Sequence, residues 1–539
     1  MQRREFLRAV STATAAGLAA APAAAAMSPT PRPALPTQQA VPPFELADLP
    51  VAALQEGMTA GRWTSRRLVE LYLERIEAVD RNGPALRSVI ETNPDALRIA
   101  DELDTERRAR GSRGPLHGIP LLVKDNLDTA DRMETTAGSL ALVGVPVPRD
   151  SDVVDRLRRA GVVILGKTNL SEWANFRSTA SSSGWSARGG QTRNPYVLDR
   201  NPCGSSSGSG SAAAASLAAV TIGTETDGSI VCPSSICGLV GIKPTVGLVS
   251  RAGIIPIAAS QDTAGPMCRS VADAAQVLAA IQGYEPRDPA TARLRTRPAQ
   301  DYAGELRPDG LRGARLGVAR KGFGLPASVE PVLAEAIAAL KSLGATVLDP
   351  ADLPGVELLG DPEFEVLLYE FKQGMADYLA ARGGTGPKSL TDLMAYNTAN
   401  REREMPWFGQ EIFERAAAKG PLTSVEYRRA RGTCRRLART QGIDAILGRH
   451  RLNALVAMTT GPAWPTDYVN GDRYTGGCSS PAAVAGYPHV TVPAGSIHGL
   501  PVGLSFFGAA WSEPALIRYA FAFEQGTRAR KPPTFRPTL

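Results

Sequence analysis

The sequence predicts an α/β fold formed by one large domain, and two observations carry this prediction. Short apolar runs that are typical of buried strands alternate along the chain with amphipathic or small-residue stretches that are typical of helices. The composition is that of an ordinary globular protein, since 43% of the 539 residues are hydrophobic and 21% are charged. A chain of this length can bury a large core.

Two helices are expected before the first strand. One would be capped by Thr64 or Ser65 and ended by Gly83, and its buried face would carry four apolar residues at helical spacing, Leu68, Tyr72, Ile76 and Val79. The second would open at Asn93–Pro94, with a cap and a first-turn proline, and run to about Gly111.

Strands and a further helix alternate in the next part of the chain. Ile119–Val123, Gly161–Leu165 and Val220–Ile222 are apolar enough to be buried strands. The small residues of Ser206–Ala219 predict a tightly packed helix between the last two.

A region of different character begins after a stretch rich in Pro, Arg and Asp at about Tyr284–Arg312, which we expect on the surface. A short strand at Arg315–Ala319 and a helix from Ser328 to Gly344 are followed by mostly helical chain, so that a helical excursion spans about 320–448. The last part contains two strands and a helix, His489–Val492, Val502–Phe506 and Pro514–Arg528. We therefore expect both ends of the domain to join one sheet.

The first 26 residues are typical of an export signal. Paired arginines lie in Gln2–Leu7, a small-residue apolar run starts at Ala9, and the segment ends in Ala24–Ala26. The paired arginines predict twin-arginine export to the periplasm or the exterior. The run is too short and too rich in alanine for stable membrane insertion. Residues 27–44 are Pro-rich and are expected to be a disordered spacer before a single domain at 45–535.

Charge and metal-ligand patterns point to no nucleic-acid, metal or cofactor site. The net charge is +7, and the arginine clusters at Arg107–Arg110 and Arg435–Arg439 have acidic neighbours and no interleaved aromatics, as on solvated helix faces. Six cysteines contain no CxxC pair, and only four histidines occur. Because twin-arginine substrates fold in the reducing cytosol, we expect the cysteines to be free thiols. The sequence does not indicate an oligomeric state.

Three segments carry residues suited to chemistry. Lys124 ends an apolar strand, and burial there would lower its pKa and let it act as a neutral base. Gly204–Ser209 leads directly into a small-residue helix, where hydroxyls and backbone N–H groups converge. Gly223–Ser229 follows a strand and suits a turn that presents successive N–H groups to an oxyanion. Each segment has an alternative explanation. Lys124 could be paired with Asp125 or with another buried carboxylate, Gly204–Ser209 could be a flexible linker, and Gly223–Ser229 could contain an ordinary Asp-Gly turn.

Together these segments resemble the amidase signature family. The Gly/Ser-rich block of that family runs here from Gly204 to Thr245, and the resemblance extends from about Asp48 to about Arg530. Within the family the chain is most similar to bacterial peptide amidases, which deamidate C-terminal peptide amides, through the stretches Lys167–Phe176 and Ser183–Gln191. The resemblance implies a large mixed, mostly parallel central sheet covered by helices on both faces.

The resemblance also implies the roles of the site residues. Ser229 would be the nucleophile, Ser205 the bridging serine after a cis peptide bond, and Lys124 the base. The backbone N–H groups of Thr226, Asp227, Gly228 and Ser229 would form the oxyanion hole. An acyl-enzyme on Ser229 would form with release of ammonia, water would then hydrolyse it, and no cofactor would be needed.

The chain departs from the family pattern in two places. Cys203 and Ser207 stand where glycines are usual around the paired serines, and Met458 stands where proline is common. The first pattern also occurs in peptide amidases, so it leaves the expected catalysis intact. The second changes one expected pocket wall. Other candidate wall residues are Trp173, Phe176 and Trp464, for which a place in the core is the stronger expectation.

Several other functions fit parts of the sequence. Gly204–Gly208 matches the nucleophile elbow of α/β-hydrolases, with Ser206 as nucleophile followed by Asp444 or Asp467 and by His489 or His498, but Asn201–Cys203 is not an apolar strand. The absence of any Ser-x-x-Lys disfavours a β-lactamase mechanism. A glutaminase-like subunit of a tRNA-dependent amidotransferase is opposed by the export signal. A general amidase for small or fatty amides stays open, and intact catalytic positions oppose an inactive scaffold.

Overall fold

The apolar runs of the sequence form the strands of one large sheet. The computed structural model describes residues 41–539, so the predicted signal segment and most of the predicted spacer lie outside the described residues. Residues of this part belong to one compact unit. Its strands are β1 (Val89–Thr92), β2 (Pro120–Lys124), β3 (Val163–Thr168), β4 (Trp185–Ser186), β5 (Gly190–Gln191), β6 (Val220–Glu225), β7 (Val240–Lys243), β8 (Thr263–Cys268), β9 (Arg315–Val318), β10 (Thr346–Leu348), β11 (Ala454–Met458), β12 (His489–Ile497) and β13 (Leu500–Phe507).

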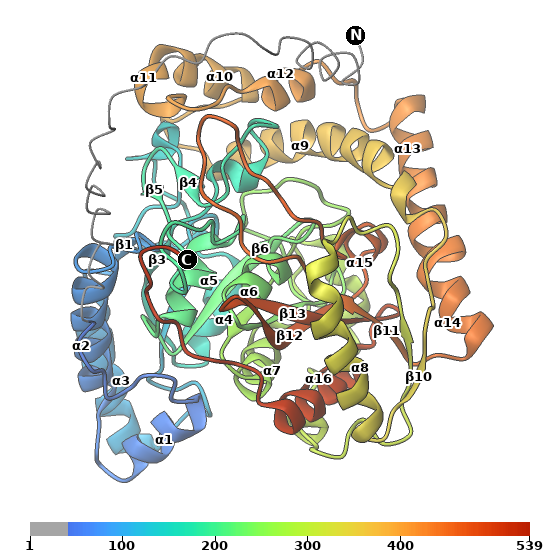
Figure 1. Cartoon of the computed structure of the whole chain (residues 1–539). Helices are drawn as coiled ribbons and strands as arrows, with labels where there is room; N and C mark the ends of the chain where they lie inside the picture. The colour runs from blue at the N-terminus through green and yellow to red at the C-terminus, as the bar shows by residue number, and fades with distance from the viewer. Residues whose placement is uncertain (1–40) are drawn as a thin grey trace, which may run out of the picture. The chain divides into compact units, whose positions relative to one another are not determined.

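The helices are shown with these strands in Figure 1. They are α1 (Val51–Thr59), α2 (Ser65–Arg75), α3 (Ala96–Arg110), α4 (Asp152–Arg159), α5 (Ser207–Ala214), α6 (Val231–Ile236), α7 (Val271–Ile281), α8 (Glu330–Ser342), α9 (Gly360–Arg382), α10 (Leu390–Ala399), α11 (Arg401–Glu404), α12 (Glu411–Ala417), α13 (Val425–Arg435), α14 (Asp444–His450), α15 (Ser480–Ala485) and α16 (Glu513–Thr527).

The sheet has eleven strands in the order β1-β3-β2-β6-β8-β7-β12-β13-β11-β9-β10. The pairs β2–β3, β2–β6, β9–β11 and β9–β10 are parallel, and the other neighbours are antiparallel. The predicted α/β class with a mixed sheet is confirmed, but the expectation of mostly parallel strands is wrong for the centre. There β12 and β13 form a hairpin, because His498 and Gly499, with φ of 52° and 84°, make a two-residue turn.

Alternate residues of the central strands face different helical layers. Val502, Leu504 and Phe506 of β13 belong to a core cluster shared with α2, α7, α8 and α16. Phe507, on the other face, packs with residues of α13, α14 and α15. The two-residue period of a strand thus places apolar side chains on both faces, as expected for a sheet with helices on both sides.

The early helices begin close to the predicted positions. Thr64 caps α2 by accepting the Arg67 N–H at 3.1 Å, and the helix continues as a π-helical turn to Arg81. The second helix, α3, starts at Ala96 because Asn93 instead accepts the Asp95 N–H in a turn (2.9 Å), and it ends at Gly111, whose φ is 83°. The predicted helix at Ser206–Ala219 is shorter and spans only α5.

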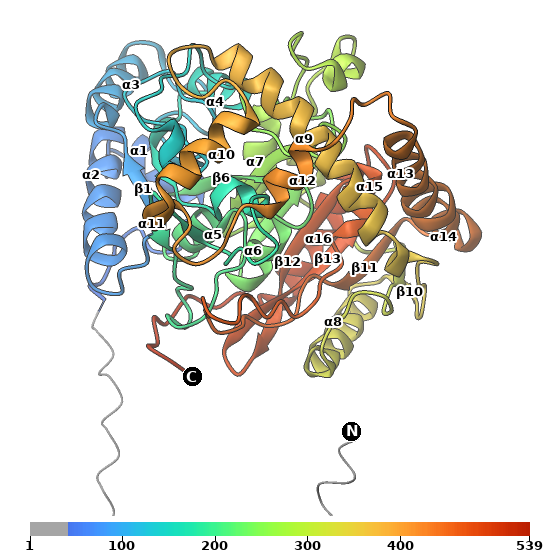
Figure 2. The same ribbon diagram turned by 90° about the horizontal axis from the view of Figure 1, so that it is seen from above.

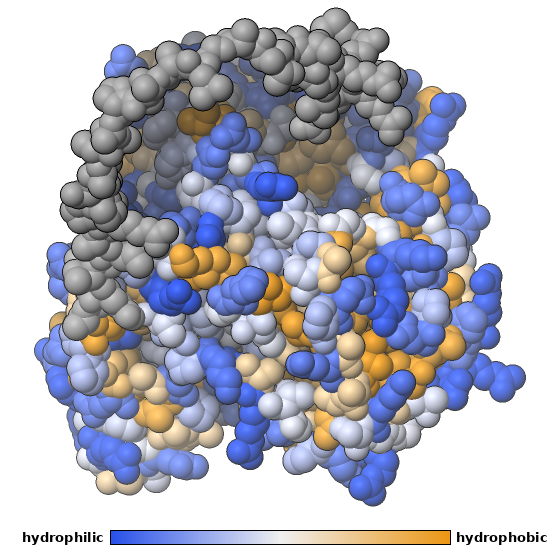
Figure 3. Space-filling view, viewed as in Figure 1, coloured by the Kyte–Doolittle hydropathy of each residue, from blue (hydrophilic) through white to orange (hydrophobic). Residues whose placement is uncertain are grey.

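The predicted excursion at about 320–448 is mostly helical. Its helices α9–α12 lie over one end of the sheet, above it in Figure 1 and in front of it in Figure 2. Between residues 41 and 539, no helix combines the length and apolar character needed to cross a membrane. On the face seen in Figure 3, hydrophilic residues predominate and apolar residues lie between them.

Candidate active site

Lys124 lies at the end of β2, between β3 and β6, and its side chain is fully buried. Its Nζ contacts Ser205 Oγ at 2.8 Å, Ser206 Oγ at 3.0 Å, Thr224 Oγ1 at 2.9 Å and the Thr224 carbonyl oxygen at 3.3 Å. Burial lowers the pKa of Lys124 to about 7, although the carboxyl groups of Asp262 and Glu225 act in the opposite direction. A large share of this lysine is therefore neutral near pH 7.

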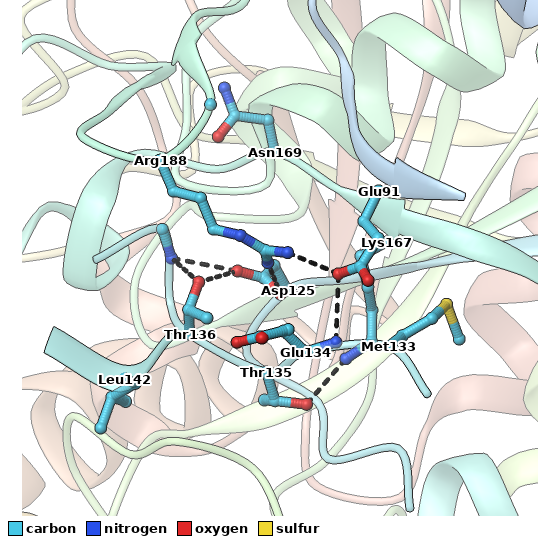
Figure 4. A network of polar contacts seen from close by, with 12 residues as sticks. Glu91, Asp125, Met133, Glu134, Thr135, Thr136, Leu142, Lys167, Asn169 and Arg188 are labelled. Atoms are coloured by element: carbon cyan, nitrogen blue, oxygen red, sulfur yellow. Dashed lines mark hydrogen bonds and ion pairs between the residues drawn. The ribbon is translucent and has the colours of Figure 1, made fainter. Parts of the chain in front are cut away.

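The neighbouring Asp125 does not pair with Lys124, so the alternative of an ion pair between them is wrong. Asp125 accepts hydrogen bonds from Thr136 Oγ1 and from the Gly138 N–H (3.2 Å), and Arg188 Nη1 lies 3.4 Å from it. Figure 4 shows this network, in which Arg188 also binds Glu91 at 2.5 Å. Arg188 comes from the stretch that carried the closer family resemblance. Because Arg188 is the cationic partner of Asp125, Lys124 contacts Ser205 and Ser206 instead of that carboxyl.

Ser205 follows a cis peptide bond to Gly204, as the family resemblance implied. Its side chain is fully buried, and Lys124 Nζ is the hydrogen-bond partner of its hydroxyl. Its carbonyl oxygen accepts the Ser171 N–H at 3.0 Å, which anchors the loop. The next residue, Ser206, donates from Oγ to the Thr224 carbonyl oxygen (3.0 Å), and its N–H donates to the Ser229 carbonyl oxygen (3.2 Å). Ser206 thus joins the two serine loops.

Ser229 lies in the turn between β6 and α6, and the residue is 8% exposed. Within residues 41–539 its hydroxyl has no hydrogen-bond partner, so the structure does not join Ser205 Oγ and Ser229 Oγ by a hydrogen bond. The backbone N–H groups of Thr226, Asp227, Gly228 and Ser229 also donate to no group in the described part of the chain. Four successive donors beside a free hydroxyl are the arrangement that an oxyanion site needs.

Buried acids hold this turn in place. Glu225 Oε2 accepts the N–H groups of Ile230 and Val231 at 2.8 and 3.0 Å, directly after Ser229. Asp262 accepts from Thr226 Oγ1 at 2.6 Å, and burial raises the pKa of this carboxyl to about 6. Gly228 has a φ of 80°, and a Cβ there would lie 3.0 Å from Ser479 Oγ, so the turn requires glycine.

A disulfide joins the two serine-bearing segments. Cys203, two residues before Ser205, is bonded to Cys232, three residues after Ser229, with Cα atoms 6.2 Å apart. The expectation of free thiols is therefore wrong for this pair, which the fold brings together across 29 residues of sequence. The other four cysteines are free and buried, Cys237, Cys268, Cys434 and Cys478.

Two cavities flank the turn before Ser229. The larger, about 450 Å³, is lined by Thr224 and Thr226 and by the apolar segment Ile254–Ile257, among others. The smaller, about 260 Å³, is lined by residues that include Gly204, Gly228 and Trp464. Both are concave spaces of the kind that bind small ligands.

Trp173, Ala174 and Asn175 have φ of 50°, 54° and 69°, and Ala174 lines the larger cavity while Asn175 lines the smaller. Three successive left-handed residues other than glycine are strained, as is common at functional sites. Trp173 and Phe176 belong to a buried apolar cluster, Met458 lies in the main core, and none of these three lines either of the two cavities. Of the candidate wall residues, Trp464 lines the smaller cavity.

The α/β-hydrolase alternative is wrong. Ser206 contacts Lys124 and Thr224 and has no histidine partner. His489 is buried in the sheet against Ser505, and burial lowers its pKa to about 3. His498 lies in the β12–β13 turn. No Ser-His-Asp set is assembled around Ser206 within residues 41–539.

Two residues that contribute to the site were not predicted from the sequence. Thr224 Oγ1 contacts Lys124 Nζ and also accepts from Asn126 Nδ2 at 3.0 Å. Thr224 lies inside the Gly223–Ser229 segment and Asn126 two residues after Lys124, so both were in view as neighbours of candidate residues. Only the parallel pairing of β2 with β6 shows that their side chains meet.

Residues 67–517 match the Amidase family. The native peptide amidase of Stenotrophomonas maltophilia, a solved structure, is 56% identical, with 92% of this chain and 100% of that chain covered and a TM-score of 0.88. A probable amidase of Arabidopsis thaliana is 43% identical, with 91% and 92% covered. A glutamyl-tRNA(Gln) amidotransferase subunit of Symbiobacterium thermophilum is 37% identical, with 89% and 97% covered. The chain therefore belongs to the amidase signature family and is an amide-hydrolysing enzyme.

Proposed function

We propose that this enzyme hydrolyses C-terminal peptide amides through an acyl-enzyme on Ser229, with Ser205 as the proton relay and Lys124 as the base. The observation that carries the mechanism is the 2.8 Å contact between the fully buried Lys124 Nζ and Ser205 Oγ. A neutral lysine has two N–H donors and one lone pair. Ser206 Oγ and Thr224 take the donors, which leaves the lone pair for the Ser205 hydroxyl proton.

The reaction follows from this arrangement. Once the substrate is bound, Ser205 Oγ accepts the proton of Ser229 and passes its own proton to Lys124 Nζ. Ser229 Oγ attacks the amide carbonyl carbon, and the free N–H groups of Thr226–Ser229 bind the oxyanion. The C–N bond breaks as the nitrogen receives the proton and leaves as ammonia. Water then hydrolyses the acyl-enzyme by the same relay.

The assignment of peptide amides rests on similarity and on one feature of the site. The peptide amidase of Stenotrophomonas maltophilia is 56% identical over its full chain. Arg188, from the stretch Ser183–Gln191 on which the sequence resembles peptide amidases, contacts Asp125 beside the proposed catalytic lysine. A general amidase on small or fatty amides is the alternative. A glutaminase-like role is the second alternative, since one relative belongs to a glutamyl-tRNA(Gln) amidotransferase.

Ammonia release separates these functions. The mature enzyme and a Ser229→Ala variant are assayed with C-terminal peptide amides, amino-acid amides, a fatty amide and glutamine. We expect release mainly from peptide amides and none from the variant. Release mainly from small or fatty amides or glutamine would overturn the substrate assignment and keep the mechanism, whereas full activity in Ser229→Ala would overturn the mechanism.

We also propose that the enzyme is exported by the twin-arginine route. The paired arginines of Gln2–Leu7 support this, and the Cys203–Cys232 disulfide fits an oxidising compartment. Fractionation of cells that express the full chain or an Arg3→Lys, Arg4→Lys variant tests it. We expect the variant to stay in the cytosol, and equal distribution of the two proteins would contradict the proposal.

A further inference from the structure

The segment Thr226–Ser229 is held by side chains from outside the amidase motifs. Gln261 lies in the loop before β8 and is 1% exposed. Its Nε2 donates to the Thr226 carbonyl oxygen at 3.3 Å and to Glu363 Oε1 at 2.7 Å. Glu363 lies in the first turn of α9 and is 7% exposed. One amide group thus connects the expected oxyanion segment to the helical excursion.

Glu363 also meets the next residue of that segment. Its carboxyl lies close enough to the Asp227 carboxyl for the two groups to repel each other when both are charged. Burial, followed by repulsion from Asp227, raises the pKa of Glu363 well above its ordinary value. Burial therefore favours the neutral form of the Glu363 carboxyl.

A serine of α15 holds the Asp227 side chain. Asp227 Oδ2 accepts from Ser480 Oγ, at the start of α15, at 2.6 Å. Asp227 Oδ1 is buried and has no hydrogen-bond partner among residues 41–539. A buried carboxylate oxygen without a donor is costly, and this cost favours a neutral carboxyl at the neighbouring Glu363.

We infer that Glu363 is a positioning residue of the oxyanion segment, which acts with Gln261 by fixing the Thr226 carbonyl and the Asp227 side chain from α9. The peptide planes on both sides of residues 226 and 227, whose N–H groups have no acceptor in the described part of the chain, are thereby fixed before substrate binds. Preorganised donors stabilise a developing oxyanion without reorganisation during the reaction. This inference rests on the proposed function, because it assigns the N–H groups to the oxyanion.

The role predicts a loss in kcat rather than in substrate binding. Glu363→Ala removes both contacts, and a misplacement of the donors lowers kcat about 10- to 100-fold while KM stays within about twofold. Glu363→Gln keeps a neutral donor and acceptor, so we expect its kcat within about threefold of the wild type. Gln261→Leu preserves the side-chain volume but removes the hydrogen bonds that join Glu363 to the Thr226 carbonyl oxygen, and its kcat should fall as in Glu363→Ala.

The experiment measures kcat and KM for a peptide amide and Ki for a peptide aldehyde, whose adduct with Ser229 carries an oxyanion. The Ki should rise by a factor similar to the loss in kcat. Glu524→Ala is the matched control, since it removes a mostly buried α16 carboxyl that accepts the Val271 N–H at 2.8 Å and contacts no part of residues 226–229. We expect it to change neither kcat nor Ki.

Unchanged kcat in folded Glu363→Ala, or a Glu363→Gln variant as slow as Glu363→Ala, would overturn the inference. If Glu363→Ala does not fold, wild-type kcat in Gln261→Leu overturns it equally. Failure of the proposed function looks different: the wild type would hydrolyse no amide, or Ser229→Ala would stay active. An active wild type with inactive Ser229→Ala and unaffected Glu363 and Gln261 variants would reject only the positioning role.

Discussion

The pH dependence of activity is expected to follow the protonation of Lys124. Burial lowers its pKa from 10.5 to about 7, so the neutral base is present above pH 7 and is lost as pH falls below it. We expect kcat/KM to fall about tenfold per pH unit below pH 7 and to level off above about pH 8. Rates measured from pH 5 to 9 test this. A flat profile from pH 6 to 9 would count against a lysine base.

Substitution of the same lysine separates catalysis from stability. Lys124→Met should abolish turnover while the fold persists. Because the folded pKa of Lys124 is lowered, the folded state binds fewer protons than the unfolded state between about pH 7 and 10.5, so wild-type stability rises with pH through that window. Unfolding by urea at several pH values should show this rise in the wild type and lose this contribution in Lys124→Met. Wild-type turnover in the variant would exclude the relay.

Thr224 is expected to orient the amino group of Lys124. Thr224→Val removes the hydroxyl that contacts Lys124 Nζ and Asn126 Nδ2, so the lone pair of the lysine is no longer directed at Ser205. We expect kcat to fall about tenfold. Thr224→Ser retains the hydroxyl and should recover most of the rate. Steady-state kinetics of both variants test this expectation, and equal rates in Thr224→Val and wild type would show that Ser206 and the Thr224 carbonyl oxygen suffice to orient the lysine.

At the scale of elements, the disulfide connects the Ser205 loop to α6. It closes a segment of 29 residues, and a loop of that length predicts about 3 to 4 kcal/mol of stabilisation in the chain-entropy account. Replacement of both Cys203 and Cys232 by Ser should therefore lower the midpoint of thermal unfolding and also reduce kcat, because the two serine segments lose their link. Calorimetry and kinetics measure these effects.

A reductant provides the control for that comparison. Treatment with dithiothreitol should lower the thermal midpoint of the wild type and leave the double serine variant unchanged. The four remaining cysteines are free, so reduction has no second disulfide to break in residues 41–539. The opposite result would be a wild-type thermal midpoint that reductant does not change, with only four thiols open to alkylation in the unfolded, unreduced protein. The bond would then be present but would not stabilise the enzyme.

At the scale of the whole molecule, Arg177 connects the helical excursion to the segment that follows β3. It is fully buried, pairs with the carboxyl groups of Glu172 and Glu404 (3.5 Å for Glu404), and donates to the Glu404 carbonyl oxygen of α11 at 2.6 Å. Its guanidinium also lies over the rings of Phe408 and Trp185, at 4.5 and 5.7 Å. Arg177→Met would leave two buried carboxyl groups without their cation, which costs about 3 kcal/mol.

Urea denaturation of Arg177→Met measures that loss directly. The matched control is Arg98→Met, which breaks an exposed pair with Glu102 on α3 and should leave the free energy of unfolding nearly unchanged. If the two variants unfold at the same urea concentration, the buried arginine does not hold the excursion in place.

Much of the fold could be predicted from local sequence patterns. The buried strands β2, β3, β6, β9 and β13 and the helices α2, α8 and α16 lie close to their predicted positions, because period and capping are read from neighbouring residues. The short strands β7 and β10 carried no such signal. Their place in the sheet depends on partners far along the chain. The antiparallel centre was missed for the same reason.

The sequence by itself determined the family and the enzyme class, and it supplied the three proposed catalytic residues, since Lys124, Ser205 and Ser229 are parts of contiguous segments. Only the tertiary structure decided what surrounds them. Thr224, Gln261 and Glu363 meet the site from separate elements, and Cys203 reaches Cys232 across 29 residues. The reason is physical: motif identity is encoded locally, whereas burial, pKa shifts and side-chain contacts depend on how distant segments pack together.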